Sequence, residues 1–443
     1  MSAVSGGPEL AAEAVEFCSR LIQFDTSNYG GGRARGEREC ARWIAQQLAD
    51  AGYCPRVLES APGRASTVVR IPGADRAAPG LLVHAHLDVV PVAAEDWSFD
   101  PFGGEVRDGA VWGRGALDMK DMAAMTLAVV RCLARDGIVP PRDIVLAFVA
   151  DEEDTGEYGS GFLVREHAEL FSGVRVAIGE SGGHAVHLPD GSRLYPIATG
   201  ERGSAWMNLE ARGPAGHGSR PNPGNAVTAL AAAVTRLARY EWPVHLTPPV
   251  AALLDGLSTH LGVDVDLTDP AGLDRLGEAA VLVASTMSNS LNPTMLSAGY
   301  KHNVIPSTAT AGVDGRVLPG AEDAFLATVD RLLGDQVSRA FVNYDAPVSA
   351  RHDSPEFAAM AAALRAYDPQ ALILPYCMAG GTDAKAFSRL GIECYGFSPG
   401  TTPPGFARTE YVHGVDERVL VDSLAFGAGV LKRYLTAEPG RLA

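Results

Sequence analysis

Two residues that could do chemistry together, His86 and Asp88, follow directly after an apolar segment of this 443-residue chain. Residues 81–85 have the pattern of a strand buried on both faces, as in the middle of a parallel sheet. Residues two apart in an extended chain point to the same side, so His86 and Asp88 can converge on one spot. A carboxylate that holds one imidazole nitrogen leaves the other nitrogen free to bind a metal ion. Taken alone, the pair fits a core histidine beside a capping aspartate better than a metal site.

Other side chains that can bind metal ions occupy similar places in the sequence. They are Asp151-Glu152-Glu153 after the apolar run 144–150, Glu180 after the run 174–178, Asp118 after the glycine-rich turn 113–117, and His413 near the end of the chain. Each has a structural alternative, such as a solvated acidic loop, a turn cap, a helix N-cap or a surface histidine. Ligand sites of parallel sheets lie just past the carboxyl ends of the strands. Because the His86 pair, the acidic residues 151–153 and Glu180 all follow expected strands, a shared metal site is the better interpretation.

The elements that must position these residues alternate between strand and helix. Helices are expected at 11–24, 37–51 and 118–135, and strands at 67–71, 81–85, 144–150 and 174–178. Alternation of this kind predicts an α/β fold with a mostly parallel sheet flanked by helices.

The pattern changes near residue 200. Residues 204–211 and 308–317 alternate between apolar and polar side chains, which favours an antiparallel sheet with one wet face. Helices are expected at 225–240 and before Gly334, whereas residues 242–291 form a mixed insertion without a clear pattern. The α/β pattern resumes at the helix start Ser354-Pro355-Glu356. We therefore predict a larger α/β domain of residues 1–199 and 347–443, and an inserted smaller α+β domain of residues 200–346.

Composition excludes several classes of partner. The 53 acidic and 37 basic side chains give a formal net charge of -16, which argues against nucleic acid or an anionic membrane as a partner. The six cysteines form no C-x-x-C pair, as is typical of reduced thiols in the cytosol. Residues 1–8 lack the basic and apolar segments of a signal peptide, and no apolar run approaches the ~20 residues that span a bilayer. We expect a soluble, cytoplasmic protein.

The order of the chemical residues resembles the zinc-dependent peptidase and amidohydrolase family that includes glutamate carboxypeptidase, acetylornithine deacetylase, succinyl-diaminopimelate desuccinylase and aminoacylase. That family's pattern is H-x-D, G-x-x-D, E-E, a lone acidic residue and a late histidine. The chain matches it in order at His86-Leu87-Asp88, Gly115-Ala116-Leu117-Asp118, Glu152-Glu153, Glu180 and His413. The resemblance covers nearly the whole chain. It departs at Asp121, where many members have glycine, and at the insertion 242–291, which is longer than the family's minimal lid.

The resemblance implies a di-zinc exopeptidase-like fold with two divalent metal ions bridged by Asp118. His86 and Glu180 would hold one ion, and Glu153 and His413 would hold the other. Mixed histidine and carboxylate ligands suit zinc, and cobalt or manganese would also be accepted. Two ions ~3.5–4 Å apart can share a hydroxide and polarise the scissile carbonyl between them.

The resemblance also implies three catalytic side chains. Asp88 would orient His86 from behind. Glu152 would be the general base, taking a proton from the bridging water and passing it to the leaving amine. His217, in the glycine loop of the inserted domain, resembles the lid histidine that reaches a neighbouring active site and stabilises the oxyanion.

Substrate contacts are implied for Asn303, Arg316, Gly380 and Gly381. Asn303 and Arg316 match an N-V-I-P…R block whose asparagine and arginine bind the oxyanion region and the substrate carboxylate, and an arginine fork suits that planar anion. Arg316 could instead be a sheet-face cation paired with Asp314. The two glycines resemble a late glycine-rich substrate loop. His84 has no counterpart among the family's ligands, so we expect it to be structural.

Our leading hypothesis is a metal-dependent hydrolase that cleaves an amide bond beside a free carboxylate. The substrate would be an N-acyl amino acid or a short peptide, and the motifs do not separate a deacylase from a dipeptidase or carboxypeptidase. Members of the family often dimerise through the lid, so we expect a homodimer through the inserted domain. The alternative is a catalytically inactive binding or scaffold protein on the same fold, against which the retention of Glu152 argues.

Overall fold

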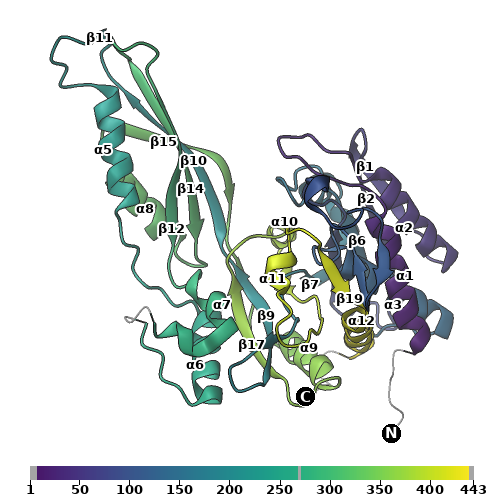
Figure 1. Cartoon of the computed structure of the whole chain (residues 1–443). Coiled ribbons are helices and arrows are strands. Elements are labelled where there is room, and N and C mark those ends of the chain that lie inside the picture. The colour runs from purple at the N-terminus through teal and green to yellow at the C-terminus, as the bar shows by residue number, and fades with distance from the viewer. Residues whose placement is uncertain (1–6, 268–270, 439–443) are drawn as a thin grey trace.

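The computed structural model describes residues 7–267 and 271–438 (Figure 1). Residues 1–6, which contributed to the argument against a signal peptide, lie outside the described residues. The same is true of residues 268–270 in the predicted insertion and of residues 439–443 at the end of the larger domain. Within the described ranges, none of the helices combines the length and the apolar character that a membrane span requires.

A large mixed sheet forms the centre of the molecule. Its strands follow the order β1-β2-β6-β3-β7-β18-β9-β16, with β8 and β17 also paired to β9. In that order they span Arg56–Ala61, Arg64–Ile71, Ile144–Val149, Gly80–His86, Val174–Gly179, Glu393–Gly396, Arg193–Glu201 and Val348–Ser349, with β8 at Val186–His187 and β17 at Leu372–Met378. The strands β6, β3, β7 and β18 run parallel at the centre, whereas β1, β2 and β16 pair antiparallel at the margins. The α/β sheet expected from the sequence is therefore present, with its parallel strands in the middle.

Helices cover both faces of this sheet, as the continuous apolar strands predict. Every residue of β3 is buried. Leu81 and Val83 face a core shared with α1 (Pro8–Ile22), α2 (Arg38–Asp50), α3 (Lys120–Asp136), α9 (Pro355–Arg365) and α12 (Val421–Leu435). Leu82 faces the opposite core, which contains side chains of α4 (Ser160–Glu166) and α10 (Ala384–Ser388). Successive side chains of a strand point to opposite faces, so β3 must be apolar throughout.

Short elements complete the larger part of the molecule. They are the three-stranded sheet β19-β5-β4 (Arg418–Leu420, Ala110–Trp112 and Glu105–Arg107), the helix α11 (Arg408–Tyr411), and the 3-10 helices η1 (Ala94–Asp96) and η2 (Ala168–Phe171). Helix α3 begins at Lys120, so Asp118 lies in the preceding turn and is not its first residue. The helix ends at Gly137, whose φ of 65° is the left-handed conformation that glycine adopts readily at this position.

A second, antiparallel sheet extends away from the first (Figure 1). Its order is β12-β14-β10-β15, at Ser290–Ala298, Thr308–Val317, Gly203–Arg212 and Val337–Asp345. Helices α5 (Ala226–Ala238) and α8 (Glu322–Leu333) pack on one face through an apolar core of their own. At the far end of this sheet, β11 (Gly216–His217) pairs with β13 (Val304–Ile305) (Figure 1). The alternating pattern of 308–317 thus correctly predicted a sheet with only one covered face.

Part of the segment 242–291, which had no clear sequence pattern, packs on the large sheet. Helices α6 (Pro248–Leu261) and α7 (Ala280–Ala284), with the 3-10 helix η3 (Leu273–Ala279), share a core with residues of β9 and β17. Leu253 and Leu257 of α6 are fully buried there. Part of the 200–346 segment therefore contributes to the body of the molecule, and the domain division at 200 and 346 stays a prediction.

Candidate metal centre

Two groups of metal-binding side chains share Asp118. One group contains His86, Asp118 and Glu180, the other contains Asp118, Glu153 and His413, and the ligand atoms within each group lie within 4.8 Å of one another. Nε2 of His86 is 3.0 Å from Oδ1 of Asp118, and Nε2 of His413 is 3.0 Å from Oδ2. Nε2 of His413 is also 3.3 Å from Oε2 of Glu153. The two oxygens of one carboxylate therefore face two separate groups, an arrangement able to bridge two ions.

The topology of the large sheet brings these residues together. His86 is the last residue of β3, Glu153 follows β6, and Glu180 comes directly after β7. Because β6, β3 and β7 are parallel neighbours, their carboxyl ends meet at one edge of the sheet. Asp118 lies in the turn before α3, and His413 follows α11.

The turn with Asp118 and the loop with His413 are tied to each other by Glu417. This buried carboxylate accepts hydrogen bonds from the backbone N–H groups of Gly115 and Leu117, at 3.0 and 2.7 Å, and an ion pair of 2.6 Å from Arg114. Arg114 in turn donates to the carbonyl oxygen of His413, at 3.2 Å. Burial raises the pKa of Glu417 to about 7, although Arg114 lowers it. No local pattern indicated this contact, which joins residues 303 positions apart.

The donor set fits a pair of cations. Burial raises the pKa of the carboxyl groups of Glu152, Glu153 and Glu180, because a buried carboxylate loses its hydration. Oε1 of Glu153 is buried and has no hydrogen-bond partner among the described residues. Burial also opposes ionisation of Asp118, but its hydrogen bonds with His413 and His86 lower its pKa. Buried carboxylates without sufficient partners are what bound cations would neutralise, and this set of His and carboxylate donors suits zinc, cobalt or manganese.

Asp88 contacts His86 differently from the expected way. Nδ1 of His86 donates to the backbone carbonyl of Asp88 at 2.9 Å, whereas the nearer carboxylate oxygen is 3.9 Å away. The Asp88 carboxylate instead accepts from the backbone N–H groups of Glu152 and Glu153, each at 3.1 Å. The carbonyl therefore fixes the imidazole, and the carboxylate fixes the turn that carries Glu152 and Glu153.

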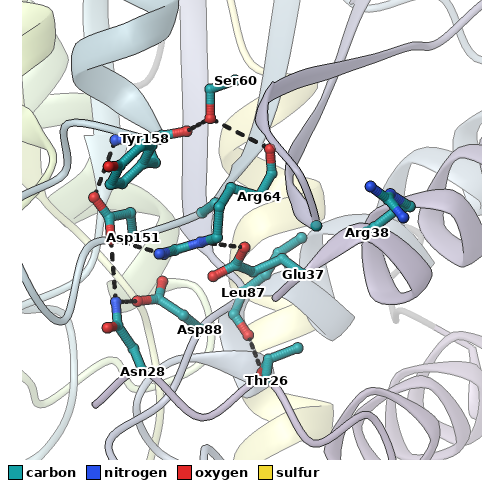
Figure 2. A network of polar contacts seen from close by, with 12 residues as sticks. Thr26, Asn28, Glu37, Arg38, Ser60, Arg64, Leu87, Asp88, Asp151 and Tyr158 are labelled. Atoms are coloured by element: carbon teal, nitrogen blue, oxygen red, sulfur yellow. Dashed lines mark hydrogen bonds and ion pairs between the residues drawn. The ribbon is translucent and has the colours of Figure 1, made fainter. Parts of the chain in front are cut away.

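A buried polar network surrounds Asp88 and Asp151, the residue that precedes this turn (Figure 2). Asn28 Nδ2 donates to Asp88 at 2.9 Å and to Asp151 at 3.2 Å. Arg64 forms ion pairs with Asp151 at 2.7 Å and with Glu37 at 3.0 Å. The side chains of Glu37 and Asp151 are fully buried, and that of Arg64 is 6% exposed. Sequence reasoning missed Asn28, Glu37 and Arg64, because nothing in their local patterns marks them as partners.

Glu152 belongs to neither ligand group and lines a cleft. Its Oε2 is 3.9 Å from Nε2 of His86, and its side chain is 15% exposed. The cleft, of about 510 Å³, lies between the two parts of the molecule and is also lined by Arg316 and Gly381. Arg316 forms a fork with Asp314 at 2.8 and 3.1 Å, which is the pairing considered as the alternative role for this residue. Gly380 precedes Gly381 in the loop after β17.

His217 and Asn303 lie at the far tip of the second sheet. His217 is in β11, which is distant from the large sheet in Figure 1. Gly218 N–H donates to the carbonyl of Asn303 at 3.0 Å, and His217 Nδ1 is 2.8 Å from the hydroxyl of Ser219. The fold of one chain thus keeps these two side chains away from that chain's own ligand groups.

His84 has the surroundings of a core residue. It is 2% exposed, and its ring centroid lies 5.1 Å from that of Phe387. Burial, together with the charge of His86, lowers the pKa of His84 to about 3. A ring that stays neutral among apolar neighbours agrees with the structural role expected for it.

Comparison with known proteins gives one consistent result. The model of the family "Peptidase family M20/M25/M40" matches residues 82–437. Aminoacylase-1 of Sus scrofa is 29% identical over 403 residues, covering 89% of this chain and 88% of the relative. The N-fatty-acyl-amino acid synthase/hydrolase PM20D1 of Homo sapiens is 29% identical over 377 residues, covering 81% of this chain and 74% of the relative.

Solved structures share the fold over almost the full length. The M20 family metallo-carboxypeptidase Sso-CP2 from Sulfolobus solfataricus superimposes with a TM-score of 0.70 at 17% identity, covering 96% of this chain and 98% of that one. YXEP of Bacillus subtilis, described as a dinuclear metal binding peptidase of the M20 family, gives a TM-score of 0.60 at 14% identity with the same coverage. At these identities the likeness shows the fold alone.

Proposed function

The chain belongs to peptidase family M20/M25/M40, and we propose that it is a two-metal hydrolase that cleaves an amide bond next to a free carboxylate. Family membership and the aminoacylase relatives make it a hydrolase of amide bonds. The observation that carries the finer proposal is the sharing of Asp118 by two ligand groups beside the cleft that Glu152 lines.

In this proposal the two ligand groups hold the two ions, zinc in the first place. His86, Asp118 and Glu180 would bind one ion, and Asp118, Glu153 and His413 the other. When bound, a pair of divalent ions polarises a carbonyl oxygen and makes water more acidic. The contact between His86 and the Asp88 carbonyl directs Nε2 of the imidazole toward Asp118.

Glu152 would move the proton. Burial raises the pKa of its carboxyl group, which suits a group that accepts a proton. Its backbone N–H is held by Asp88 at 3.1 Å, which fixes the side chain at the cleft. Glu152 would accept a proton from the attacking water and deliver it to the leaving amine.

The relatives support a substrate with an acylated amino group and a carboxylate. Two are named aminoacylase-1 and N-fatty-acyl-amino acid synthase/hydrolase, and similar folds belong to a metallo-carboxypeptidase and a dipeptidase. We propose an N-acyl amino acid or a short peptide, with N-acyl-amino-acid deacylase and dipeptidase or carboxypeptidase as the two forms of the activity. Arg316 and Gly381, which line the cleft, are proposed substrate contacts.

We further propose a homodimer formed through the inserted domain, residues 200–346. The position of His217 and Asn303 at the tip of the second sheet supports it, since they could serve only a neighbouring subunit's ligand groups (Figure 1). A cytoplasmic location is also proposed, because all six cysteines are free thiols.

The test of the proposed function is Glu152→Gln, which keeps the shape of the side chain and removes its basicity. We expect two metal ions per chain in both proteins, and a fall in kcat of about 10²- to 10⁴-fold on a panel of N-acetyl amino acids and dipeptides. Glu157→Gln is the matched control, because Glu157 lines the same cleft but is exposed and paired with Arg165.

Two results would contradict this proposal in different ways. Turnover in Glu152→Gln equal to that of the unaltered chain would remove Glu152 from its role. Absence of turnover of every panel member by the unaltered chain, with zinc, cobalt or manganese added, would favour an inactive binding or scaffold protein.

A further inference from the structure

The cleft beside Glu152 contains a lysine whose charge is not compensated. Lys385, in the first turn of α10, lines this cleft together with Glu152 and Arg316. Among residues 7–267 and 271–438, its ammonium group has neither a hydrogen-bond partner nor an ion-pair partner. Burial lowers the pKa of Lys385, so the carboxylates farther away do not offset its loss of hydration. An unpaired charge in a partly buried site is costly, and such groups are concentrated at functional sites.

The other cations of the cleft are already neutralised. Arg316 forms a two-pronged ion pair with Asp314. Arg389 donates to Asp345 at 2.8 Å. Lys385 is therefore the cation of this cleft that can bind a ligand anion without breaking an existing ion pair.

The nearest loop is arranged so that the ammonium stays free. Glu201, whose charge acts on Lys385, accepts hydrogen bonds from the Thr382 hydroxyl at 2.7 Å and from its backbone N–H at 3.1 Å. Gly381 leaves room for the lysine, because a Cβ atom at this position would lie 2.0 Å from Nζ of Lys385 and 2.4 Å from Cε. A side chain at position 381 would occupy the place of the ammonium group.

We propose that Lys385 binds the carboxylate of the substrate and is the residue that makes the enzyme select acylated amino acids over uncharged amides. Arg316 then has a lesser part, because it would have to leave Asp314 to form the same contact. The inference rests on the proposed function, since it assigns the anion-binding group within that cleft. A lysine is suited to this task as a compact charge that can approach an anion from several directions.

The test compares one substrate in two forms, the best N-acetyl amino acid or dipeptide of the panel and the same compound with its carboxylate converted to a carboxamide. Lys385→Met should raise KM for the carboxylate form by about 10- to 100-fold, the loss expected for a hydrogen bond to a charged group. KM for the carboxamide form should change less than about threefold, because that form has no carboxylate for Lys385 to bind. The value of kcat on the carboxylate form should also change less than about threefold, because the contact is equally present in the ground and transition states. The metal content should not change.

Two further variants keep the test decisive. Arg389→Gln is the matched control, since it removes a cation of the same cleft whose charge is already paired, and KM should stay within about threefold. Gly381→Ala should likewise raise KM more for the carboxylate form than for the carboxamide form, because its Cβ would displace the ammonium group of Lys385. It answers the question even if Lys385→Met fails to fold.

The outcomes separate this inference from the proposed function. If the unaltered chain hydrolyses the panel but Lys385→Met and Gly381→Ala keep the preference for the carboxylate form, Lys385 is not the anion-binding group. The same holds if Arg316→Met alone abolishes that preference. If the unaltered chain hydrolyses no member of the panel, the proposed function itself is overturned.

Discussion

Replacing Arg64 by methionine should destabilise the chain strongly, because Arg64 is the cation of a buried network. Its side chain is 6% exposed and pairs with Glu37 and Asp151, whose side chains are fully buried. Removing one partner of a buried ion pair costs about 3–5 kcal/mol of unfolding free energy, since it leaves a buried charge uncompensated. Although Arg64 pairs with two carboxylates, the loss should not be twice this value, because Asp151 keeps hydrogen bonds from Asn28 and from the Tyr158 backbone.

The cost should depend on pH through Glu37. Burial, and then the charge of Asp88, raises the pKa of Glu37 to about 7, while Arg64 lowers it. A carboxyl group whose pKa is higher in the folded state stabilises that state at low pH, and this stability is lost as pH rises through the folded pKa. Without Arg64 the pKa of Glu37 rises further. The loss of unfolding free energy in Arg64→Met should therefore be largest at about pH 8. It should be at least about 1 kcal/mol smaller at about pH 5.5, where Glu37 is protonated.

Urea unfolding of the metal-free chain measures this cost, because bound ions would add their own stabilisation. Trp43, which packs against Phe17 in the same core, provides the fluorescence signal. Arg70→Met is the matched control on the same strand, since Asp143, the partner of Arg70, keeps an ion pair with Arg76. The control should lose about 1–2 kcal/mol, because Arg70 also donates to the carbonyl oxygens of Leu170 and Ser172 but its side chain is 29% exposed. A loss for Arg64→Met no larger than that of the control, or one equal at both pH values, would refute the argument.

Two further predictions concern side chains around the site. Asp88→Asn should lower kcat by about tenfold or more through misplacement of Glu152, yet retain both metal ions in elemental analysis, because the Asp88 backbone carbonyl still holds His86. Loss of metal would mean that the carboxylate orients His86 after all. His217→Ala should be nearly inactive alone but regain turnover when subunits are exchanged with Glu152→Gln, since the mixed dimer has one complete site. No recovery in the exchanged mixture would exclude a shared site.

The sequence alone pointed to the strands and to the residues that end them. The mostly apolar runs before His86, Glu152 and Glu180, broken only by His84 and Arg175, predict strands of a sheet with both faces covered, and such strands occur as parallel neighbours. Since parallel neighbours end at the same edge, the ordered spacing was enough to anticipate that these residues would meet. The structure brings five side chains, His86, Asp118, Glu153, Glu180 and His413, into two groups that share Asp118.

Local patterns carried no information about the supporting contacts. Arg64 and Asp151 are 87 positions apart, and Glu417 meets Leu117 across 300 positions. The periodicity of a sequence indicates which face of one helix or strand is apolar. It does not indicate which polar side chain of another element will contact that element. For the same reason the packing of α6 and α7 on the large sheet could not be foreseen from the mixed pattern of 242–291.

Only the tertiary structure decided how each polar group is used. Whether the carboxylate or the carbonyl of Asp88 meets His86 depends on the turn after β6, which draws the carboxylate to the backbone of Glu152 and Glu153. Whether Arg316 or Lys385 is free to bind an anion depends on Asp314, which forms an ion pair with the arginine. The residue types and their order determined what chemistry this chain could perform. The partners that the fold places beside each buried charge determined which side chains remain free to perform it.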